Sequence, residues 1–266
     1  MGDVDSPSYP KTPRNTVNRY KPRAAKYDYE TIHNIINTAP ILHVSFATPD
    51  PSDPFPALLP MLGFMGSYSS PDATPSESLD LYLHGYVSSR LMRMGKTATG
   101  EEEGMPMTIA ATHFDGVVLA LTPNNHSYNY RSVIMQGYAK VVEDVDEKLW
   151  AMERTTNSVV EGRWEHTRVP PNKTEMTTTQ ILRVTPISAS AKIRSGPPHD
   201  DRHDLKDEKL REKTWIGVLP ASIQYGAPIA SPDNRAGDVK SHEHITSFVK
   251  EKNKIGEERS VAAASE

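Results

Sequence analysis

Short runs of β-type residues follow one another along this chain, and few helical stretches separate them. Apolar or alternating runs that are typical of strands occur at 41–47, 57–65 and 79–85, and proline-containing or polar loops lie between them. Pro60 in the second run is compatible with an edge strand or a bulge. The alternation of strand and long helix that a doubly wound fold needs is missing. Consecutive strands with short links instead favour an antiparallel sheet that closes on itself.

The β pattern continues through the second half of the chain. Asp115-Gly116 lies between the runs 105–114 and 117–121 and is a strong hairpin signal. Further strands are expected within 124–144, within 180–194 (as a strand, a turn and a second strand) and within 214–220. We therefore predict a mainly β protein with flanking helices.

Helix signals are few. Asp28 can cap a helix that carries isoleucines at helical spacing and ends before Pro40. Ser88 or Ser89 can cap a short helix that Gly95 closes. A further helix is expected to start at the capping-box-like pair Asp144 and Glu147 and to carry Val145, Leu149 and Met152 on one face.

Length and composition predict one packed domain with irregular additions. The chain has 266 residues and 22 prolines, and its mean hydropathy is −0.57. We expect a flexible N-terminal arm over 1–25 that can fold against the domain. The domain itself is expected over 26–232, and a polar C-terminal tail with room for a short helix is expected over 233–266.

Charge and cysteine content exclude several function classes. A net charge of −4 argues against general nucleic-acid binding, which needs a basic excess. The absence of cysteine excludes disulfides, Cys-ligated zinc, iron–sulfur clusters and a thiol nucleophile. No apolar run approaches the roughly 20 residues that span a membrane, and the N-terminus lacks the apolar core of a secretory signal. We expect a cytoplasmic protein without a membrane partner.

The stretch "YLHGYVSSRLMR" holds the first candidate binding site. A predicted strand ends at His84-Gly85, and a predicted helix begins near Ser88. Helix N-termini present free N–H groups and a partial positive charge, which suit a phosphate. The hydroxyls of Ser88 and Ser89 and the guanidinium of Arg90 add donors. The alternative is an ordinary capped helix with a solvated arginine.

Arg131 is the second candidate, because an arginine that leads an apolar strand is costly unless its charge is exposed or paired. It can bind an anion, or it can bridge to a carboxylate such as Asp115. Lys192 and Arg194 share a strand face and allow the same two interpretations. The run "HDDRHD" is a polar loop more simply than a metal site, and we predict no metal. Trp215 is expected in the core rather than as a surface for a ring.

The order of several motifs resembles one family. "LYLHGYVSSRLMR", "DGVVLAL", "HSYNYRSVIMQGYAKVVED", "SASAKIRSGPPHDD" and "WIGVLP" occur as in flavin-nucleotide-binding proteins related to pyridoxamine 5'-phosphate oxidase, which include nitroimidazole-resistance reductases. The resemblance covers roughly residues 22–232. It implies an antiparallel split β-barrel that binds FMN, generally as a homodimer with FMN at the subunit interface.

The resemblance also gives roles to individual residues. The helix start is where this family holds the FMN phosphate, and "YRSV" begins a strand that is expected to line the flavin. The strand that contains Met61 usually meets the isoalloxazine edge. The residues implied in cofactor binding are Met61, His84, Gly85, Ser88, Ser89, Arg90, Tyr130, Arg131, Ser132 and Val133.

The implied function is an FMN-dependent oxidoreductase that acts on a small organic molecule, with NAD(P)H as reductant. Leu91 stands where pyridoxamine 5'-phosphate oxidases carry a lysine, which argues against oxidation of pyridoxamine phosphate itself. The alternative is a non-catalytic protein that binds or stores a flavin or a haem, with His84 and His126 as candidate haem ligands. The third interpretation is a dimeric scaffold without a cofactor.

Overall fold

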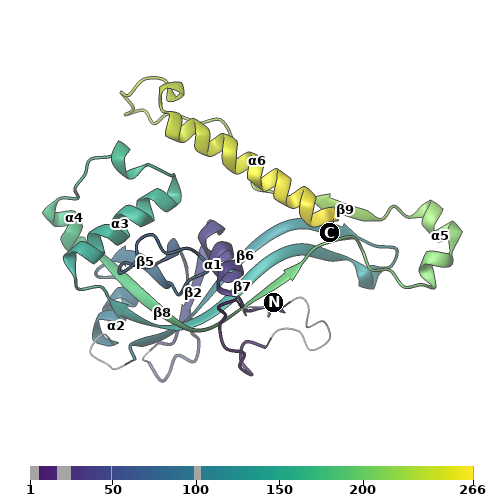
Figure 1. Ribbon diagram of the computed structural model, residues 1–266, viewed down its shortest axis with the longest axis horizontal. Coiled ribbons are helices and arrows are strands. Elements are labelled where there is room, and N and C mark those ends of the chain that lie inside the picture. Colours follow the sequence, from purple (N-terminus) through teal and green to yellow (C-terminus); the bar gives the residue numbers. More distant parts are fainter. Residues whose placement is uncertain (1–5, 17–24, 49, 99–102, 266) are drawn as a thin grey trace, which may run out of the picture. The chain divides into compact units, whose positions relative to one another are not determined.

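A computed structural model describes residues 6–16, 25–48, 50–98 and 103–265, and Figure 1 labels most of their helices and strands. The chain divides into two compact units. The first unit comprises the chain up to Thr112 together with Ser132–Lys192, and the second comprises His113–Arg131 together with Ile193 onward. Among the described residues, no helix is both long and apolar enough to cross a membrane.

Most of the secondary structure belongs to the first unit. Its elements are β1 (Ala25–Lys26), α1 (Tyr29–Thr38), β2 (Leu42–Phe46), β3 (Ala57–Met61), β4 (Gly63–Gly66), β5 (Asp80–Tyr86), α2 (Arg90–Ala98), α3 (Val145–Val159) and α4 (Lys173–Thr178). Three strands run through both units, namely β6 (Met105–Leu119), β7 (Ser127–Val141) and β8 (Thr179–Arg194). The second unit adds α5 (Glu208–Lys213), β9 (Gly217–Pro220) and α6 (Glu243–Ser265).

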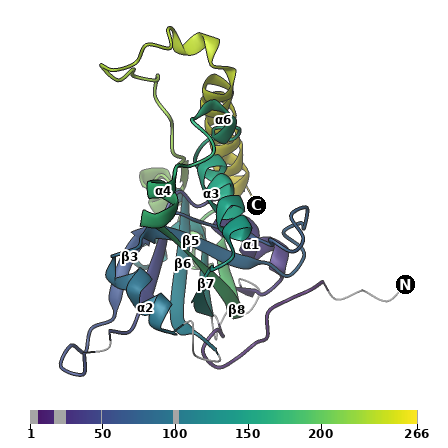
Figure 2. The same ribbon diagram turned by 90° about the vertical axis from the view of Figure 1, so that its left-hand side faces the viewer.

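Within the described residues, nine strands form one hydrogen-bonded sheet in the order β3-β2-β6-β7-β8-β5-β4, with β1 beside β8 and β9 beside β6. The pairings of β2 with β3 and β6, and of β5 with β4 and β8, are antiparallel. Leu62 alone separates β3 from β4 in the chain, so the two ends of this strand order are joined. The neighbouring strands β6, β7 and β8 can be followed in Figure 2.

Gly63 shows how this sheet closes. A Cβ atom at this position would lie 2.7 Å from Leu83 of β5 and 2.9 Å from Leu42 of β2. Leu83 and Leu42 belong to the strands next to the two ends of the sheet, so the ends meet at Gly63. The predicted antiparallel sheet that closes on itself is confirmed. The run 57–65 forms two strands around this corner rather than one, and Pro60 lies on the edge strand β3, as expected.

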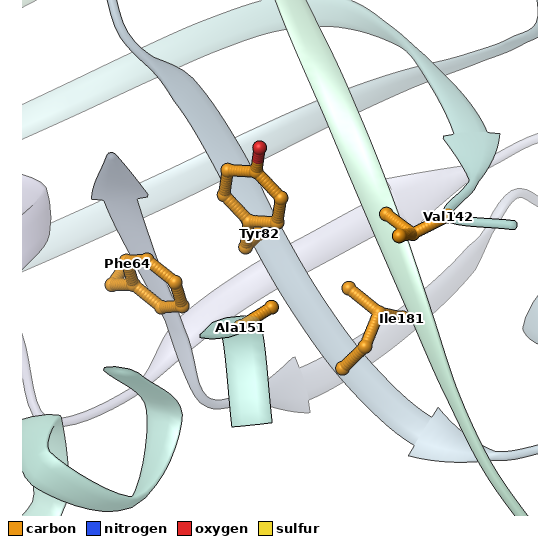
Figure 3. Close-up of a cluster of buried hydrophobic side chains, with 5 residues drawn as sticks. All are labelled: Phe64, Tyr82, Val142, Ala151 and Ile181. Atoms are coloured by element: carbon orange, nitrogen blue, oxygen red, sulfur yellow. The ribbon is translucent and has the colours of Figure 1, made fainter. Parts of the chain in front are cut away.

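The core of the first unit contains a cluster formed by Phe64, Tyr82, Val142, Ala151 and Ile181 (Figure 3). The rings of Phe64 and Tyr82 stack with their centroids 5.3 Å apart, and Trp150 packs against both rings. The cluster joins β4, β5, β8 and α3, so it fixes the position of α3 on the sheet.

The helix α3 starts at the predicted cap but buries a different face. Asp144 accepts a hydrogen bond from the backbone N–H of Glu147 at 2.7 Å. Met152 of the predicted apolar face packs against the core cluster, whereas Val145 is 64% exposed. The carboxylate of Glu147 instead faces inward, because it accepts hydrogen bonds from the Tyr82 hydroxyl at 2.8 Å and from Arg183 at 3.0 Å. A buried polar contact therefore overrides the apolar pattern.

Two further helices start as predicted, but one of them ends later than expected. Asp28 caps α1 by accepting from Thr31 at 2.8 Å, and the isoleucines of α1 are buried, as predicted. Gly95 does not close α2, which continues to Ala98. A Cβ atom at Gly95 would lie 2.6 Å from a methyl group of Leu182, so this glycine allows the helix to approach β8 closely.

The hairpin expected at Asp115-Gly116 is wrong. β6 continues through both residues, and the chain reverses later, at the short 3-10 turn 123–125. The Asp115 carboxylate is bound by Arg131, and Gly116 pairs with Pro220 of β9. The turn expected within 180–194 is also absent, because β8 is continuous over these residues.

The N-terminal segment 6–16 is bound to the first unit. The Tyr9 hydroxyl lies 2.7 Å from Nε2 of the buried His33. Asn15 is buried as well, and its amide donates to the carbonyl oxygen of Ala189 at 3.2 Å. This described part of the expected flexible arm is therefore docked on the domain.

The expected polar tail contains a long helix. α6 has 23 residues. Asn253 of α6 exchanges two hydrogen bonds with the backbone of Tyr225, at 2.7 and 2.9 Å. Near the end of α6, the carbonyl oxygen of Ala263 accepts from the backbone N–H of Gly196 at 2.7 Å and from Asn129 at 3.0 Å. Phe248 of α6 also contacts the ring of Tyr225, but Ser260 is the only buried one among the described residues of the helix, so hydrophobic periodicity did not reveal it.

Candidate functional site

The end of β5 and the start of α2 bring several predicted residues together. His84 and Gly85 lie near the end of β5 and pair with Ile181 and Gln180 of β8. The backbone N–H of Ser89 then donates to the carbonyl oxygen of Tyr86 at 2.8 Å, which turns the chain into α2. This region is therefore a strand that ends at the beginning of a helix.

Ser89 is the residue that caps α2. Its hydroxyl oxygen accepts from the backbone N–H of Met92 at 3.3 Å. Arg90 is the first residue of the helix, so the N–H groups of Arg90 and Leu91 have no carbonyl partner inside the helix. Such free N–H groups, together with the helix dipole, favour an anion at this point.

Two arginines lie at the same helix start. The Arg90 guanidinium carbon lies 6.0 Å from the centre of the Phe46 ring. Arg93 reaches back along the helix, and its Nη1 donates to the carbonyl oxygen of Ser88 at 2.8 Å. Arg93 was not predicted as a site residue, although its position three residues after Arg90 places both side chains on neighbouring positions of one helix face.

His84 is a neutral side chain with an unused nitrogen. Burial lowers the pKa of the imidazole below its usual value, which keeps the ring uncharged near neutral pH. Its Nδ1 atom is buried, and no described residue hydrogen-bonds to it. A buried polar atom without a partner is unusual in a native protein. It is therefore a possible contact point for a bound molecule.

The remaining predicted residues of the first unit differ in exposure. Met61 ends the edge strand β3 and is partly exposed. The Ser132 hydroxyl donates to the carbonyl oxygen of Lys192 at 3.2 Å. Val133 is only 1% exposed, so its side chain packs in the core and not on a surface.

Arg131 belongs to the second unit and is paired. Its Nε and Nη2 atoms each donate to one carboxylate oxygen of Asp115 at 2.8 Å, and both side chains are largely buried. The ion pair that the sequence analysis kept as an alternative is therefore present. Partial burial lowers the pKa of Arg259 on α6, and the positive charge of Arg131 lowers it further. Tyr130 precedes this pair on β7.

The other charged candidates of the second unit are hydrogen-bonded within the protein. Arg194 donates to the carbonyl oxygens of Gly196 and Pro197 at 3.0 Å and also contacts Asn129. Asp200 accepts from the backbone N–H of Leu121 at 2.8 Å. No cluster of three potential metal ligands occurs among the described residues.

Trp215 contradicts its expected place in the core. Its side chain is 63% exposed. The neighbouring Gly217 shows where the ring lies, because a Cβ atom at Gly217 would be 2.7 Å from the Trp215 ring. The indole therefore folds over the start of β9 and leaves most of its surface in solvent.

Comparisons with known proteins agree on the type of fold. Residues 28–193 match the profile of the family described as pyridoxamine 5'-phosphate oxidase, and they make up more than half of the chain. No match to a curated protein was found at significant similarity. Three solved structures are similar to this chain.

A flavocytochrome, Anf3 from Azotobacter vinelandii, is 28% identical, with a TM-score of 0.70, and the alignment covers 91% of this chain and 99% of that one. The FAD and haem binding protein from Mycobacterium smegmatis is 24% identical, with a TM-score of 0.67 and coverage of 85% and 97%. A candidate 5-nitroimidazole antibiotic resistance protein from Bacteroides thetaiotaomicron is 18% identical, with a TM-score of 0.46 and coverage of 64% and 86%. The predicted split β-barrel is confirmed.

Proposed function

The chain belongs to the pyridoxamine 5'-phosphate oxidase family, and from this premise we propose that it binds a flavin nucleotide and uses it as an oxidoreductase. The observation that carries the proposal is the start of α2. Ser89 caps the helix there, Arg90 is its first residue, and Arg93 folds back to the carbonyl oxygen of Ser88, a few residues after the partly buried His84. The donors and positive charges at this point fit the phosphate of a flavin nucleotide.

We propose roles for the residues of the first unit in holding the cofactor. Arg90 and Arg93 neutralise the phosphate, and the first N–H groups of α2 hydrogen-bond to its oxygens. Met61, at the end of the strand β3, lies against the ring. The neutral His84 offers its unpaired Nδ1 as a hydrogen-bond partner for the cofactor or the substrate.

A bound flavin supplies the hydride and electron transfer chemistry, so the protein itself needs no acid–base pair for that step. The protein binds the cofactor, keeps the ring in place and positions a small organic substrate beside it. We propose NAD(P)H as the reductant, FMN as the flavin, and a cytoplasmic homodimer as the working state. Homodimerisation is implied by the family resemblance, and the absence of cysteine is compatible with a reducing compartment.

The absorption spectrum of the purified protein tests this function. The proposal predicts flavin bands after incubation with FMN, and it predicts bleaching of these bands when NADH or NADPH is added without oxygen. A protein that binds neither FMN nor FAD would contradict flavin binding. A flavin that stays oxidised with both reductants would contradict the oxidoreductase role and leave flavin binding intact.

A second candidate function is binding of a haem together with a flavin. Two solved structures that match most of this chain are a flavocytochrome and an FAD and haem binding protein. His126 is exposed, and its Nδ1 donates to the carbonyl oxygen of Thr122 at 2.9 Å, which leaves Nε2 available for a metal. A Soret band that appears on addition of haemin and disappears in His126→Ala would support this function. Absence of the band would contradict it.

A further inference from the structure

A cavity of about 680 Å³ lies within the first unit, where β2 ends and β6 begins. The residues predicted for the flavin site are not among its described lining residues. Its volume falls in the range of pockets that bind small molecules, which is about 300–1,000 Å³. The cavity is therefore large enough for a nucleoside monophosphate and needs an explanation of its own.

Flat and apolar side chains form much of the wall. Phe46 comes from β2, Met107 from β6, Tyr138 from β7 and Ile187 from β8. Phe46 and Met107 are buried, whereas Ile187 is half exposed and leaves apolar surface open. Aromatic and aliphatic side chains at such a site favour a planar ring, which can stack on them.

A fixed amide adds hydrogen-bonding capacity to the wall. The Ser188 hydroxyl donates to Oε1 of Gln136 at 2.7 Å, which leaves the Nε2 group of Gln136 as a donor. Among the described residues, none accepts a hydrogen bond from this group. The Tyr138 hydroxyl is bound by Glu103, which raises the pKa of the phenol and keeps it uncharged.

The cavity wall carries one positive charge and has one negative charge beside it. Arg14 is the charged side chain among the described lining residues, and the Glu103 carboxylate is bound to the hydroxyl of the lining Tyr138. Asn15 holds the turn that carries Arg14, since its side chain accepts from the backbone N–H of Thr12 at 2.8 Å and donates to Ala189 of β8. The arginine therefore lies on a segment that is attached to the cavity wall.

We propose that this cavity binds a small anion that carries a planar ring and has the size of a nucleoside monophosphate. The ring packs against the side chains of Phe46 and Tyr138, the Gln136 amide hydrogen-bonds to it, and Arg14 pairs with the phosphate. The ligand is either a separate molecule or the adenylate part of a dinucleotide cofactor. The inference does not require that the protein use a flavin, because Phe46, Tyr138, Gln136 and Arg14 are not among the proposed flavin contacts.

Calorimetric titration of the purified full chain with AMP tests this inference. We expect saturable binding, and we expect about tenfold weaker binding in Arg14→Ala, since a charged hydrogen bond contributes on this scale. Gln136→Ala is expected to weaken binding as well. Arg202→Ala removes an exposed arginine of the second unit and serves as the matched control, with unchanged affinity. Absence of AMP binding, or equal affinity of Arg14→Ala and the wild type, would overturn the proposal.

A second set of titrations identifies the source of the ligand. The same protein is saturated with FMN or with FAD before AMP is added. If FAD but not FMN blocks AMP, the cavity holds the adenylate of a dinucleotide. If AMP still binds after saturation with FMN and after saturation with FAD, the cavity takes a separate molecule. Either of these two outcomes supports ligand binding in the cavity. A protein that takes up no flavin contradicts the proposed function, but it can still bind AMP. Failure of the proposed function and failure of this inference are therefore distinguishable.

Discussion

The contact between Tyr9 and His33 permits a sharp test of how the N-terminal segment is held. Nδ1 of His33 lies 2.8 Å from the carbonyl oxygen of Pro75, which can only accept, so Nδ1 carries the proton. Nε2 is then an acceptor, and the Tyr9 hydroxyl donates to it at 2.7 Å. Both side chains are buried, so water does not replace a lost partner.

The substitution Tyr9→Phe removes this donor and keeps the aromatic ring. The ring of residue 9 retains its packing on Tyr29, whose centroid lies 4.6 Å away. The buried Nε2 of His33 loses its partner, which is expected to lower the free energy of unfolding by about 1–3 kcal/mol. Urea denaturation measures this change. Tyr86→Phe is the matched control, because its side chain is 61% exposed and the cost is expected to stay below about 0.5 kcal/mol.

The pH dependence of stability gives a second readout of the same contact. Burial lowers the pKa of His33 to about 4, whereas the unfolded chain has a value near 6.5. The unfolded state therefore binds more protons between these values, and the contribution of His33 is complete above pH 6.5 and is lost as the pH falls toward 4. At about 1.4 kcal/mol for each unit of pKa, the contribution is roughly 3 kcal/mol.

In Tyr9→Phe, neutral His33 loses a hydrogen bond, so its pKa is expected to rise and the loss of stability on acidification is expected to shrink. The difference between the variant and the wild type isolates this effect from other titrating groups. An unfolding free energy equal to that of the wild type, together with an identical pH profile, would refute the assignment of the tautomer.

Further variants probe other contacts by urea denaturation. Arg131→Ala leaves the buried Asp115 carboxylate without its partner and is expected to cost about 3–5 kcal/mol, whereas replacement of both residues by apolar ones is expected to cost much less. Gly95→Val places a side chain against Leu182 and is expected to cost about 1–3 kcal/mol or more; a cost below 0.5 kcal/mol would contradict close packing of α2 on β8. Asp144→Ala removes the cap of α3 and is expected to cost about 1 kcal/mol, with Asp146→Ala in the same first turn as its control.

Local patterns in the sequence predicted the antiparallel sheet and the start of each long helix in the first unit. Asp28, Ser89 and Asp144 cap helices because their short side chains reach the first free N–H groups, and this depends on a few neighbouring residues. The closure of the sheet followed from the short links between strands. These features need no information about residues far away in the chain.

The wrong predictions depend on distant partners. Asp115-Gly116 is typical of a hairpin, but Arg131 binds the aspartate and β9 pairs with the glycine, so β6 continues. Glu147 faces inward because Tyr82 and Arg183 hydrogen-bond to it. In both cases a contact that forms only in the folded chain outweighs the local preference.

The candidate site could also be predicted only where its residues are consecutive in the sequence. The start of α2 could be predicted because strand, cap and arginine are consecutive in the sequence. Arg93 was missed because its role depends on a side chain that folds back to the carbonyl oxygen of Ser88. The cavity beside Phe46 was missed because β2, β6, β7 and β8 contribute its walls together with the turn that carries Arg14. The roles of the predicted flavin contacts stay predictions.

The most direct test of flavin binding at the start of α2 is a fluorescence titration of the flavin-free protein with FMN. The account predicts that Arg90→Ala and Arg93→Ala each weaken FMN binding about tenfold, because each removes a charged donor from the phosphate. Lys96→Ala removes a positive charge from the last turn of the same helix and is predicted to leave the affinity unchanged. Equal FMN affinity in the wild type and all three variants would contradict the placement of the phosphate at this helix.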